Sequence, residues 1–477
     1  MPVNYSDELR LSYLKAAQGA VDEQEANVAL WREFYAGEQN IELTDRQIEY
    51  LREDLDSYAN ICKRVIGILS DRLAIPEDGI TATDDSGKKY TEVATGWWTD
   101  ENTSDEGGDN DPYSLQTDVY EAALRDEQTA IIVGWDKENQ RPTFTPNLII
   151  DGGNTGLVRF HYDDSGKLTF ATKQWITSGN IDGTKNGKGR LTIYTPGYIE
   201  RYESDGKWRK LRSDEIDGLP NPQPWTDTGT FAGEPLGVNV IPFENPTGGE
   251  LADVIGIQEM LNHNTGTFDI SIDMHGFPIL SLVGYSLPID TATGYAKIPK
   301  MSPNTAIASD NETANMTRLE PADIKAMFDS GILSWVQILA LVKGWPMFLF
   351  DKTQTPPSGV ALTIMEQSLI AQIKRKQRAF SGAWRRAFNM GRKLHKLHMK
   401  EELKGQITFN WGPVEIKDPV AEAELLKVEF ETGMYPTVTR WRRLGNTEDD
   451  IRQMLQDAAS EDVFGINQGG QSPGVQQ

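Results

Sequence analysis

The sequence predicts an α+β fold dominated by helices. Long segments with apolar residues at every third or fourth position predict helices, and a middle region of short apolar runs between turn residues predicts antiparallel strands. No Gly-rich phosphate loop follows any predicted strand, which excludes the usual βαβ nucleotide-binding folds. The chain has 477 residues, enough for about two to four structural units. Apolar residues make up 38% of it and twelve are Trp, which excludes global disorder.

The composition is that of an acidic protein without disulfides. The formal net charge of −24 argues against a free-standing binder of phosphate backbones, because such affinity comes from Lys and Arg that displace counterions. Cys62 is the single cysteine, which excludes intrachain disulfides and thiolate zinc clusters. The N-terminus lacks the pattern of a secretory signal, and no apolar run approaches the about 18 residues of a membrane span. We therefore expect a soluble protein made in a reducing cytoplasm, with no membrane contact.

The first half of the chain predicts two helices followed by strands. Apolar spacing favours a helix over 7–36 and another over 44–73, with Thr44 as its N-cap. Short strand candidates fill 130–245, and Asp164-Ser165-Gly166-Lys167 has the chemistry of a hairpin turn. This pattern indicates antiparallel pairing.

The next part of the chain has a symmetric pattern of helix, insert and helix. Residues 251–275 predict one helix, Pro- and Gly-punctuated residues 277–319 predict a small β-rich insert, and Pro321 opens a second helix. Gly344-Trp345-Pro346 ends that helix abruptly. Each helix of about 24 residues would be about 36 Å long, so the pair with its tip would form a stalk.

A polar loop and a very long basic helix follow. The loop from Phe350 to Gly359 holds Lys352, Thr353, Gln354 and Thr355, which can form weak hydrogen bonds to phosphate. Taken by itself, the loop is better explained as a plain surface turn. The residues from Lys374 to Lys404 include eleven Lys or Arg and two acids. The basic positions singled out are Lys374, Arg375, Lys376, Arg378, Arg385 and Arg386.

Three interpretations of this basic helix remain open. It is a solvated face, or it pairs with the acidic surface of a neighbouring copy, or it touches nucleic acid. The charge of −24 favours the pairing between copies, followed by the solvated face.

The sequence singles out no catalytic, cofactor or metal site. Carboxylates are too numerous to select the facing pair of a glycosidase. The acidic segment from Asp100 to Asp111 lacks the Gly and the closing Glu of a calcium loop and predicts a surface loop. His395 and His398 have no carboxylate at ligand spacing on their helix face, which favours packed histidines. We expect no enzymatic activity and no cofactor.

Short phrases along the chain resemble those of a known family. They occur in one order, from about residue 28 to 455, and are Trp31 to Gly37, Asn60 to Val65, Asp71 to Leu73, Tyr194 to Pro196, Ile199 to Tyr202, Ile241 to Asn245, Ser358 to Leu362, Met434 to Pro436 and Leu444 to Asn446. Together they resemble the portal proteins of long-tailed, siphovirus-type bacteriophages. The most specific phrase, which includes Ser358, Gly359, Ala361 and Leu362, resembles the family's motif between tunnel loop and long helix.

The resemblance implies a portal fold, arranged in a ring of usually about twelve copies around a channel at one capsid vertex. Its regions, carried onto this chain, are a wing at 1–250, a first stem helix at 251–276, a clip at 277–320, a second stem helix at 321–345, a tunnel loop at 346–360, a long wing helix at 361–405, a crown at 406–462 and a disordered tail at 463–477. It implies a hinge at Gly344, Trp345 and Pro346, above the stem, and a channel contact at Lys352 to Thr355.

The implied partners are those of a DNA-packaging vertex. They are other copies of the chain, double-stranded DNA passing through without sequence recognition, the large terminase subunit, a head–tail connector, and the major capsid and scaffolding proteins. The implied location is the virion, after assembly in the bacterial cytoplasm. Two other classes are weighed against this prediction: another phage tail or baseplate protein, and a carbohydrate-active enzyme.

Overall fold

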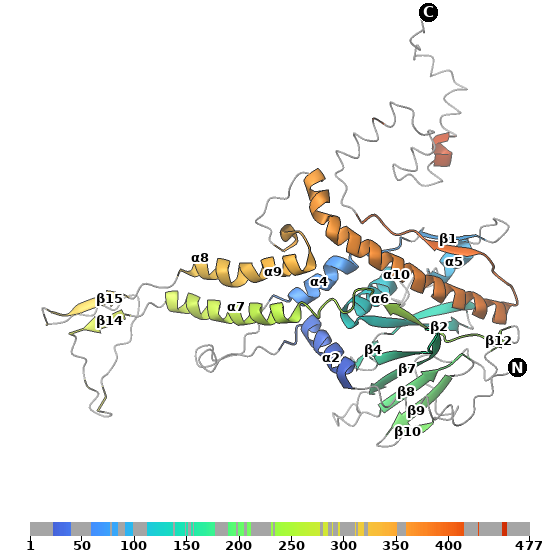
Figure 1. The fold of residues 1–477 in the computed structure, drawn as a ribbon, viewed down its shortest axis with the longest axis horizontal. Coiled ribbons are helices and arrows are strands. Elements are labelled where there is room, and N and C mark those ends of the chain that lie inside the picture. Colours follow the sequence, from blue (N-terminus) through green and yellow to red (C-terminus); the bar gives the residue numbers. More distant parts are fainter. Residues whose placement is uncertain are drawn as a thin grey trace, which may run out of the picture. The chain divides into compact units, whose positions relative to one another are not determined.

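The structure is a computed structural model that combines helices with antiparallel sheets (Figure 1). It describes residues 22–39, 59–76, 79–83, 91–98, 112–136, 139–147, 149–150, 154–155, 157–176, 189–196, 199–204, 208–210, 230–231, 234–276, 280–284, 289, 294–295, 311, 313–318, 323–350, 359–414, 428 and 451–455. The α+β prediction is confirmed. The chain divides into two compact units, one of residues 1–354 and 367–414 and the other of residues 355–366 and 415–477.

Three helices of the first unit form its N-terminal layer. They are α2 (Asp22–Ala36), α4 (Ile61–Ser70) and α6 (Pro112–Asp126), and α6 packs against both others. The predicted continuous helix over 44–73 is wrong, because the Asn60 side chain caps α4 by accepting from the Lys63 N–H. Thr44, the first turns of the predicted helix 7–36 and the loop from Asp100 to Asp111 lie outside the described residues.

Two antiparallel sheets confirm the strands predicted over 130–245. The buried strand β2 (Gln128–Asp136) lies between β13 (Val240–Glu244) and β3 (Arg141–Pro146). The second sheet has the order β10-β9-β8-β7-β6, with strands Trp208–Lys210, Ile199–Ser204, Gly189–Tyr194, Leu168–Ile176 and Leu157–Tyr162. The predicted turn joins β6 to β7, where Gly166 has φ of 77° and the Asp163 carboxylate accepts from the Ser165 and Lys167 N–H groups.

Shorter elements complete the first unit. They are α5 (Thr91–Trp98), β4 (Ile149–Ile150), β5 (Asn154–Thr155), β11 (Thr230–Phe231), β12 (Glu234–Pro235), β1 (Ile80–Thr83) and β16 (Gln406–Phe409). The strands β1 and β16 pair although they are far apart in sequence. Residues 406–409 therefore form a strand of the first unit.

The predicted pattern of helix, insert and helix is confirmed. The helix α7 (Ile255–Gly276) packs along α8 (Ile324–Met327) and α9 (Ser334–Lys343), and β14 (Leu280–Val283) pairs with β15 (Asn315–Arg318) between them in sequence (Figure 1). The second helix is not uniform, because a π-helical segment, Phe328–Leu333, separates α8 from α9. A side chain of α7 satisfies one carbonyl of this segment, because Asn264 Nδ2 donates to the Gly331 carbonyl at 2.9 Å. Pro321 lies outside the described residues.

The helix α10 (Gly359–Met399) is 41 residues long, about 60 Å at the rise of an α-helix. In the first unit it has a buried apolar stripe formed by Leu369, Ile373, Phe380, Trp384 and Phe388. The helix ends at Met399, where Lys400 has φ of 58°, and does not continue to 405 as predicted. In the second unit, residues 451–455 are helical.

Candidate functional site

The three residues of the predicted hinge all lie in the part of the chain that the structure describes. Gly344, Trp345 and Pro346 follow α9 directly. Gly359, Ala361 and Leu362 lie in the first turn of α10. Outside the described residues lie Ser358 and the four predicted channel residues Lys352, Thr353, Gln354 and Thr355. The structure therefore describes the two helices that flank the predicted tunnel loop.

Backbone geometry explains why the helix stops at Gly344. This residue has the left-handed conformation, with φ of 65° and ψ of 33°, which glycine adopts without steric cost. The Trp345 N–H donates to the Ala340 carbonyl at 2.9 Å and satisfies one of the last open carbonyls of α9. A Cβ atom at Gly344 would lie 2.9 Å from Ser368 Oγ of α10, so the two helices approach closely here.

The Gln372 side chain links the end of α9 to α10. Its Nε2 donates to the Lys343 carbonyl at 2.8 Å, and its Oε1 accepts from Trp345 Nε1 at 3.1 Å. The Trp345 ring is buried and stacks on Phe350, with ring centroids 6.1 Å apart. The Gln372 side-chain amide thus binds Lys343, the last residue of α9, with its nitrogen and Trp345, two residues later, with its oxygen.

A buried ion cluster lies next to this amide. The Glu250 carboxylate, between β13 and α7, accepts from Lys376 Nζ of α10 at 2.5 Å and from Lys343 Nζ of α9 at 3.2 Å. Lys376 also donates to Asn245 Oδ1 at 2.9 Å and to Thr247 Oγ1 at 2.7 Å. The cluster joins three segments that are distant in sequence.

The ionisation of the cluster follows from its burial and its pairing. Burial alone would raise the pKa of the Glu250 carboxyl, but the charges of Lys376 and Lys343 lower this pKa to about 2. For Lys376, burial lowers the pKa, and the attraction to Glu250 opposes that shift. Glu250 is therefore a carboxylate at neutral pH, held between two ammonium groups.

Residues Ser368, Gln372 and Lys376 are four positions apart and lie on one face of α10. All three face the end of α9 or the loop before α7. We name the set Glu250, Lys343, Gly344, Trp345, Gln372 and Lys376 the hinge cluster. Its hydrogen bonds and ion pairs hold the end of α9 against α10.

Lys376 was predicted to contact a neighbouring copy, and the structure corrects this. Its side chain is 0% exposed and its Nζ binds groups of its own chain, which leaves no surface for a second copy. The other five predicted basic residues, Lys374, Arg375, Arg378, Arg385 and Arg386, are exposed. Sequence alone could not separate Lys376 from them, because its partner Glu250 is 126 positions away.

The exposed basic side of α10 extends beyond the six positions singled out from the sequence. Arg392, Lys393 and Lys396 continue the same spacing and are partly exposed. We name the eight residues Lys374, Arg375, Arg378, Arg385, Arg386, Arg392, Lys393 and Lys396 the cationic face. The signal that finds the three added residues is the absence of any acid between 374 and 396.

The second helix of the stalk-like pair has an apolar side that its own chain does not cover. Leu339 and Ala340 are buried, whereas Leu341 is 80% exposed and Val342 is 51% exposed. Phe328 and Ile338 are also exposed. A helix that is apolar on both sides is typical of a contact between proteins.

The two predicted packed histidines are confirmed as core partners. His395 lies 5.6 Å from Trp97 between ring centroids, and His398 stacks on Trp135 at 4.6 Å. Within the described residues, no group of three or more His, Cys, Asp or Glu side chains is arranged to hold a metal ion. None of the helices described is both long enough and apolar enough to cross a bilayer.

Comparisons with known proteins identify a family. The family model described as "Phage portal protein, SPP1 Gp6-like" matches residues 162–463. No curated protein matches this chain. The match includes α7, the β14–β15 ribbon, the hinge cluster and the whole of α10.

Solved structures give weaker similarities. A chain of "Neck of empty GTA particle computed with C6 symmetry" is 10% identical with a TM-score of 0.41, covering 85% of this chain and 94% of its own. A chain of "Neck of native GTA particle computed with C12 symmetry" is 9% identical with a TM-score of 0.39, covering 81% and 90%. A chain of "Virion of native gene transfer agent (GTA) particle" is 10% identical with a TM-score of 0.38, covering 88% and 99%.

Proposed function

Since the chain belongs to the SPP1 Gp6-like family of phage portal proteins, which is structural and non-enzymatic, we propose that it forms the DNA channel at one vertex of a phage capsid. About twelve copies form a closed ring, through which DNA enters during packaging and leaves during ejection. The observation that carries this proposal is the family match over 162–463, because it includes both helices of the pair, the hinge and α10.

The regions of the ring are proposed from the helix pair. Helices α7 and α9 form the stem, and the segment 277–320 with the β14–β15 ribbon forms the clip. Residues 1–250 and the larger part of α10 form the wing, and 346–360 form the tunnel loop. The crown is proposed for the residues after the strand β16, because 406–409 pair with β1 in the first unit.

The exposed apolar side of α9 supports a ring of such stems. Leu341 and Val342 would be covered if α9 of one copy packed against the stem of the next. Apolar contacts of this kind close a cyclic assembly without any further partner. We propose that these residues lie between copies.

The channel contact is proposed for the tunnel loop. A ring of acidic chains repels phosphate from all sides, and one cation from each copy, Lys352, reduces that repulsion without gripping the DNA. Thr353, Gln354 and Thr355 add weak, exchangeable hydrogen bonds. The channel would thus guide the duplex without reading its sequence.

The proposed partners are a terminase and a head–tail connector at the clip, with major capsid and scaffolding proteins around the wing. ATP hydrolysis would belong to the terminase. The proposed location is the virion, after assembly in the bacterial cytoplasm.

Native mass spectrometry under assembly-permissive salt tests the ring. Subunits of 53.3 kDa should give a species of about 640 kDa, with a closed ring in negative-stain images. A monodisperse monomer in the same salt contradicts the proposal.

The variant Lys352→Glu tests the channel contact. We expect less DNA per capsid and unchanged ring assembly, because the change adds to the repulsion of phosphate inside the channel. Lys63→Glu is the matched control, since Lys63 is exposed on α4. Equal packaging by both variants would remove Lys352 from the channel.

A further inference from the structure

We propose that the cationic face of α10, with the cavity beside it, is the surface that receives an acidic surface of the next copy of this chain. The inference rests on the proposed ring and adds to it which surface joins its copies. It commits to one occupant, a second copy, and not to DNA or to an unrelated protein.

The cationic face contains no acid in its own sequence, and Lys396 at its end pairs with Glu402 at 2.6 Å. Its eight cations lie between residues 374 and 396, and no Asp or Glu occurs in that segment. Spacings of three, four and seven residues place them along one side of a helix, over about 33 Å. The chain as a whole has 71 acids and 47 Lys or Arg, so positive charge is concentrated here.

Neutral groups hold several of these cations in place. Arg386 Nη2 donates to the Pro242 carbonyl at 3.0 Å, Lys393 Nζ to the Leu236 carbonyl at 2.9 Å, and Arg392 Nη1 to the Gly405 carbonyl at 2.7 Å. For Arg386 and Lys393, the carbonyl orients the cation and brings no opposite charge. The side chains are therefore positioned in advance for an anionic partner, which lowers the entropy lost on binding.

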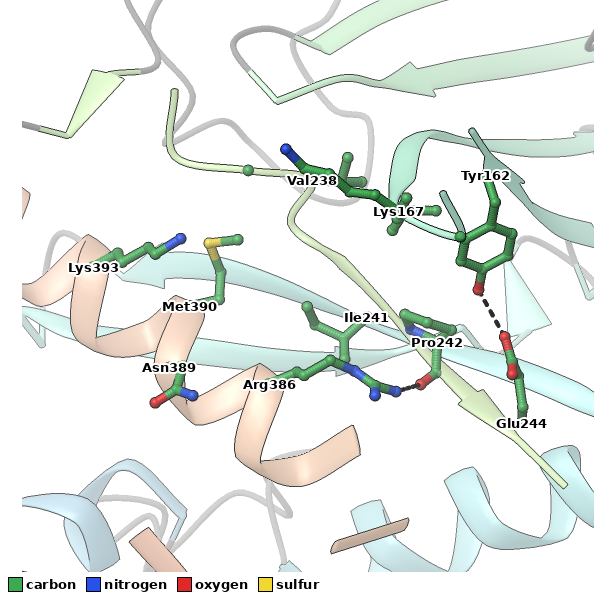
Figure 2. Close-up of a pocket in the computed structure, with 13 residues that line it drawn as sticks. Tyr162, Lys167, Val238, Ile241, Pro242, Glu244, Arg386, Asn389, Met390 and Lys393 are labelled. Carbon is green, nitrogen blue, oxygen red and sulfur yellow. Dashed lines mark hydrogen bonds between the residues drawn. The ribbon is translucent and has the colours of Figure 1, made fainter. Parts of the chain in front are cut away.

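A cavity of about 710 Å³ opens beside these cations (Figure 2). It lies between the β6–β7 turn, the segment from Gly237 to Glu244, and α10. Figure 2 shows Arg386, Asn389, Met390 and Lys393 along the helix, with Ile241 and Pro242 on the facing strand. Its apolar walls are formed by Leu168, Val238, Ile241, Pro242 and Met390, and its cations are Lys167, Arg386 and Lys393.

A glycine with a positive φ lines this cavity. Gly237 has φ of 101°, and a Cβ atom there would lie 3.4 Å from Met390 Cε. Across the cavity, Glu244 is the one acid of the lining, and the Tyr162 hydroxyl donates to it at 2.7 Å (Figure 2). The other three charged groups of the lining are cations.

A second cavity of about 310 Å³ lies on the other side of Asn389. It is lined by Arg385 and Arg392 of α10 and by residues 405–408. Asn389 lines both cavities, so the cationic face is bordered by a hollow on each side at this level. The surface is therefore shaped as well as charged.

The cavity with apolar walls favours a polypeptide over DNA. A phosphate backbone can meet the cations, but it has no apolar side chain to fill the cavity, whereas an acidic protein surface supplies both carboxylates and apolar side chains. Cyclic rings join two different faces of the same chain. A chain with one cationic face and an acid-rich remainder is complementary to itself in that arrangement.

The double variant Arg378→Glu/Arg385→Glu tests the inference on the full chain. Both residues are exposed, and among the described residues no ion pair holds either of them. Mass photometry over a concentration series should show that the variant needs at least about ten-fold more protein for half-maximal ring assembly, with an unchanged thermal unfolding temperature of the subunit. Arg378→Lys/Arg385→Lys keeps the charge and should assemble like the wild type.

Lys63→Glu/Arg64→Glu is the charge-matched control. Both residues are exposed on α4, and the formal charge change is the same as in the double variant. We expect assembly within about two-fold of the wild type, because these residues lie outside the cationic face. An equal loss of assembly in both double variants would show an effect of net charge and contradict the inference.

The cavity is tested by Arg386→Met/Lys393→Met, which keeps the aliphatic stems and removes the charges. Its effect should be smaller than that of the double Glu variant and should decrease in high salt, because salt screens the charge removed.

The remaining outcomes separate the alternatives. If Arg378→Glu/Arg385→Glu assembles like the wild type but binds a labelled 30-base-pair duplex more weakly, the face binds nucleic acid and the inference is wrong. If neither property changes, the face is only solvated and the inference is also wrong. A wild-type chain that never forms rings would instead overturn the proposed function itself.

Discussion

The hinge cluster and the cationic face share the helix α10, where Lys376 of the first lies among residues of the second, and they use their cations in opposite ways. Lys376 is buried, and its charge is matched within 2.5 Å by Glu250 of the same chain. Arg375 and Arg378, on either side of it, are exposed. Residues 374–378 thus include one buried lysine that stabilises its own chain and three exposed cations.

This difference shows what decides the role of a basic residue on a long helix. The side of α10 that faces the end of α9 is defined by Ser368, Gln372 and Lys376, and a cation there must be paired because burial penalises its charge. A cation on the neighbouring, exposed side of the helix keeps its hydration, so it needs no partner in its own chain and can bind another one. The first set stabilises one copy, and the second is proposed to join copies.

The largest expected effect on stability is that of Glu250→Gln. The change leaves Lys343 and Lys376 buried without their counter-charge and should lower the free energy of unfolding by about 3–5 kcal/mol. Urea unfolding of the subunit measures it. Glu244→Gln is the control, since Glu244 is exposed and its hydrogen bond from Tyr162 can be kept by an amide oxygen, and it should cost less than about 1 kcal/mol. Equal costs would contradict a special role of Glu250.

The stability difference between the wild type and Glu250→Gln should depend on pH. Because the pKa of Glu250 is lowered to about 2 in the folded chain, its stabilising effect is complete above pH 4.5 and is lost as pH falls toward 2. The difference in unfolding free energy between wild type and Glu250→Gln should therefore shrink by about 2 kcal/mol between pH 6 and pH 3. A difference that stays constant over this range would show that the carboxylate is not held by Lys376 and Lys343.

Lys376→Met and Arg375→Met compare the two environments directly. The first should cost about 2 kcal/mol, because Glu250 keeps Lys343 but loses its shorter ion pair. The second should change stability by less than about 0.5 kcal/mol, because Arg375 is exposed. Thermal and urea unfolding of both variants provide the measurement, and similar costs for the two would remove the distinction drawn between them.

Two glycines give the smallest and most local comparison. Gly344→Ala should destabilise by about 1–2 kcal/mol, because φ of 65° is unfavourable for alanine and the new Cβ would crowd Ser368. Gly382→Ala, in the middle of α10 with open space around it, should stabilise by about 0.5–1 kcal/mol. Opposite signs in differential scanning calorimetry support the fixed hinge, and destabilisation by both variants would contradict it.

Local patterns predicted a large part of this fold. Hydrophobic periodicity predicted α7, α9 and α10, and turn chemistry predicted the β6–β7 hairpin, because each depends on neighbouring residues. The Gly344-Trp345-Pro346 stop was predicted for the same reason, and the left-handed glycine confirms it.

Features that depend on distant partners were missed. The pairing of β1 with β16 joins residues about 330 positions apart, such as Ile80 and Phe409. The side chain of Lys376 finds Glu250, and Gln372 finds both Lys343 and Trp345, only after α9 and α10 have packed. The π-helical segment within the second helix left no signal in a periodicity count, since one added residue shifts the pattern only slightly.

A cryo-electron microscopy map of the assembled wild-type protein tests the central claim most directly. We expect a closed ring of about twelve copies, in which Arg378 and Arg385 contact acids of the neighbouring copy while Lys376 contacts only Glu250, Asn245 and Thr247 of its own chain. A protein that remains monomeric, or a ring in which the cationic face is open to solvent, would contradict the account.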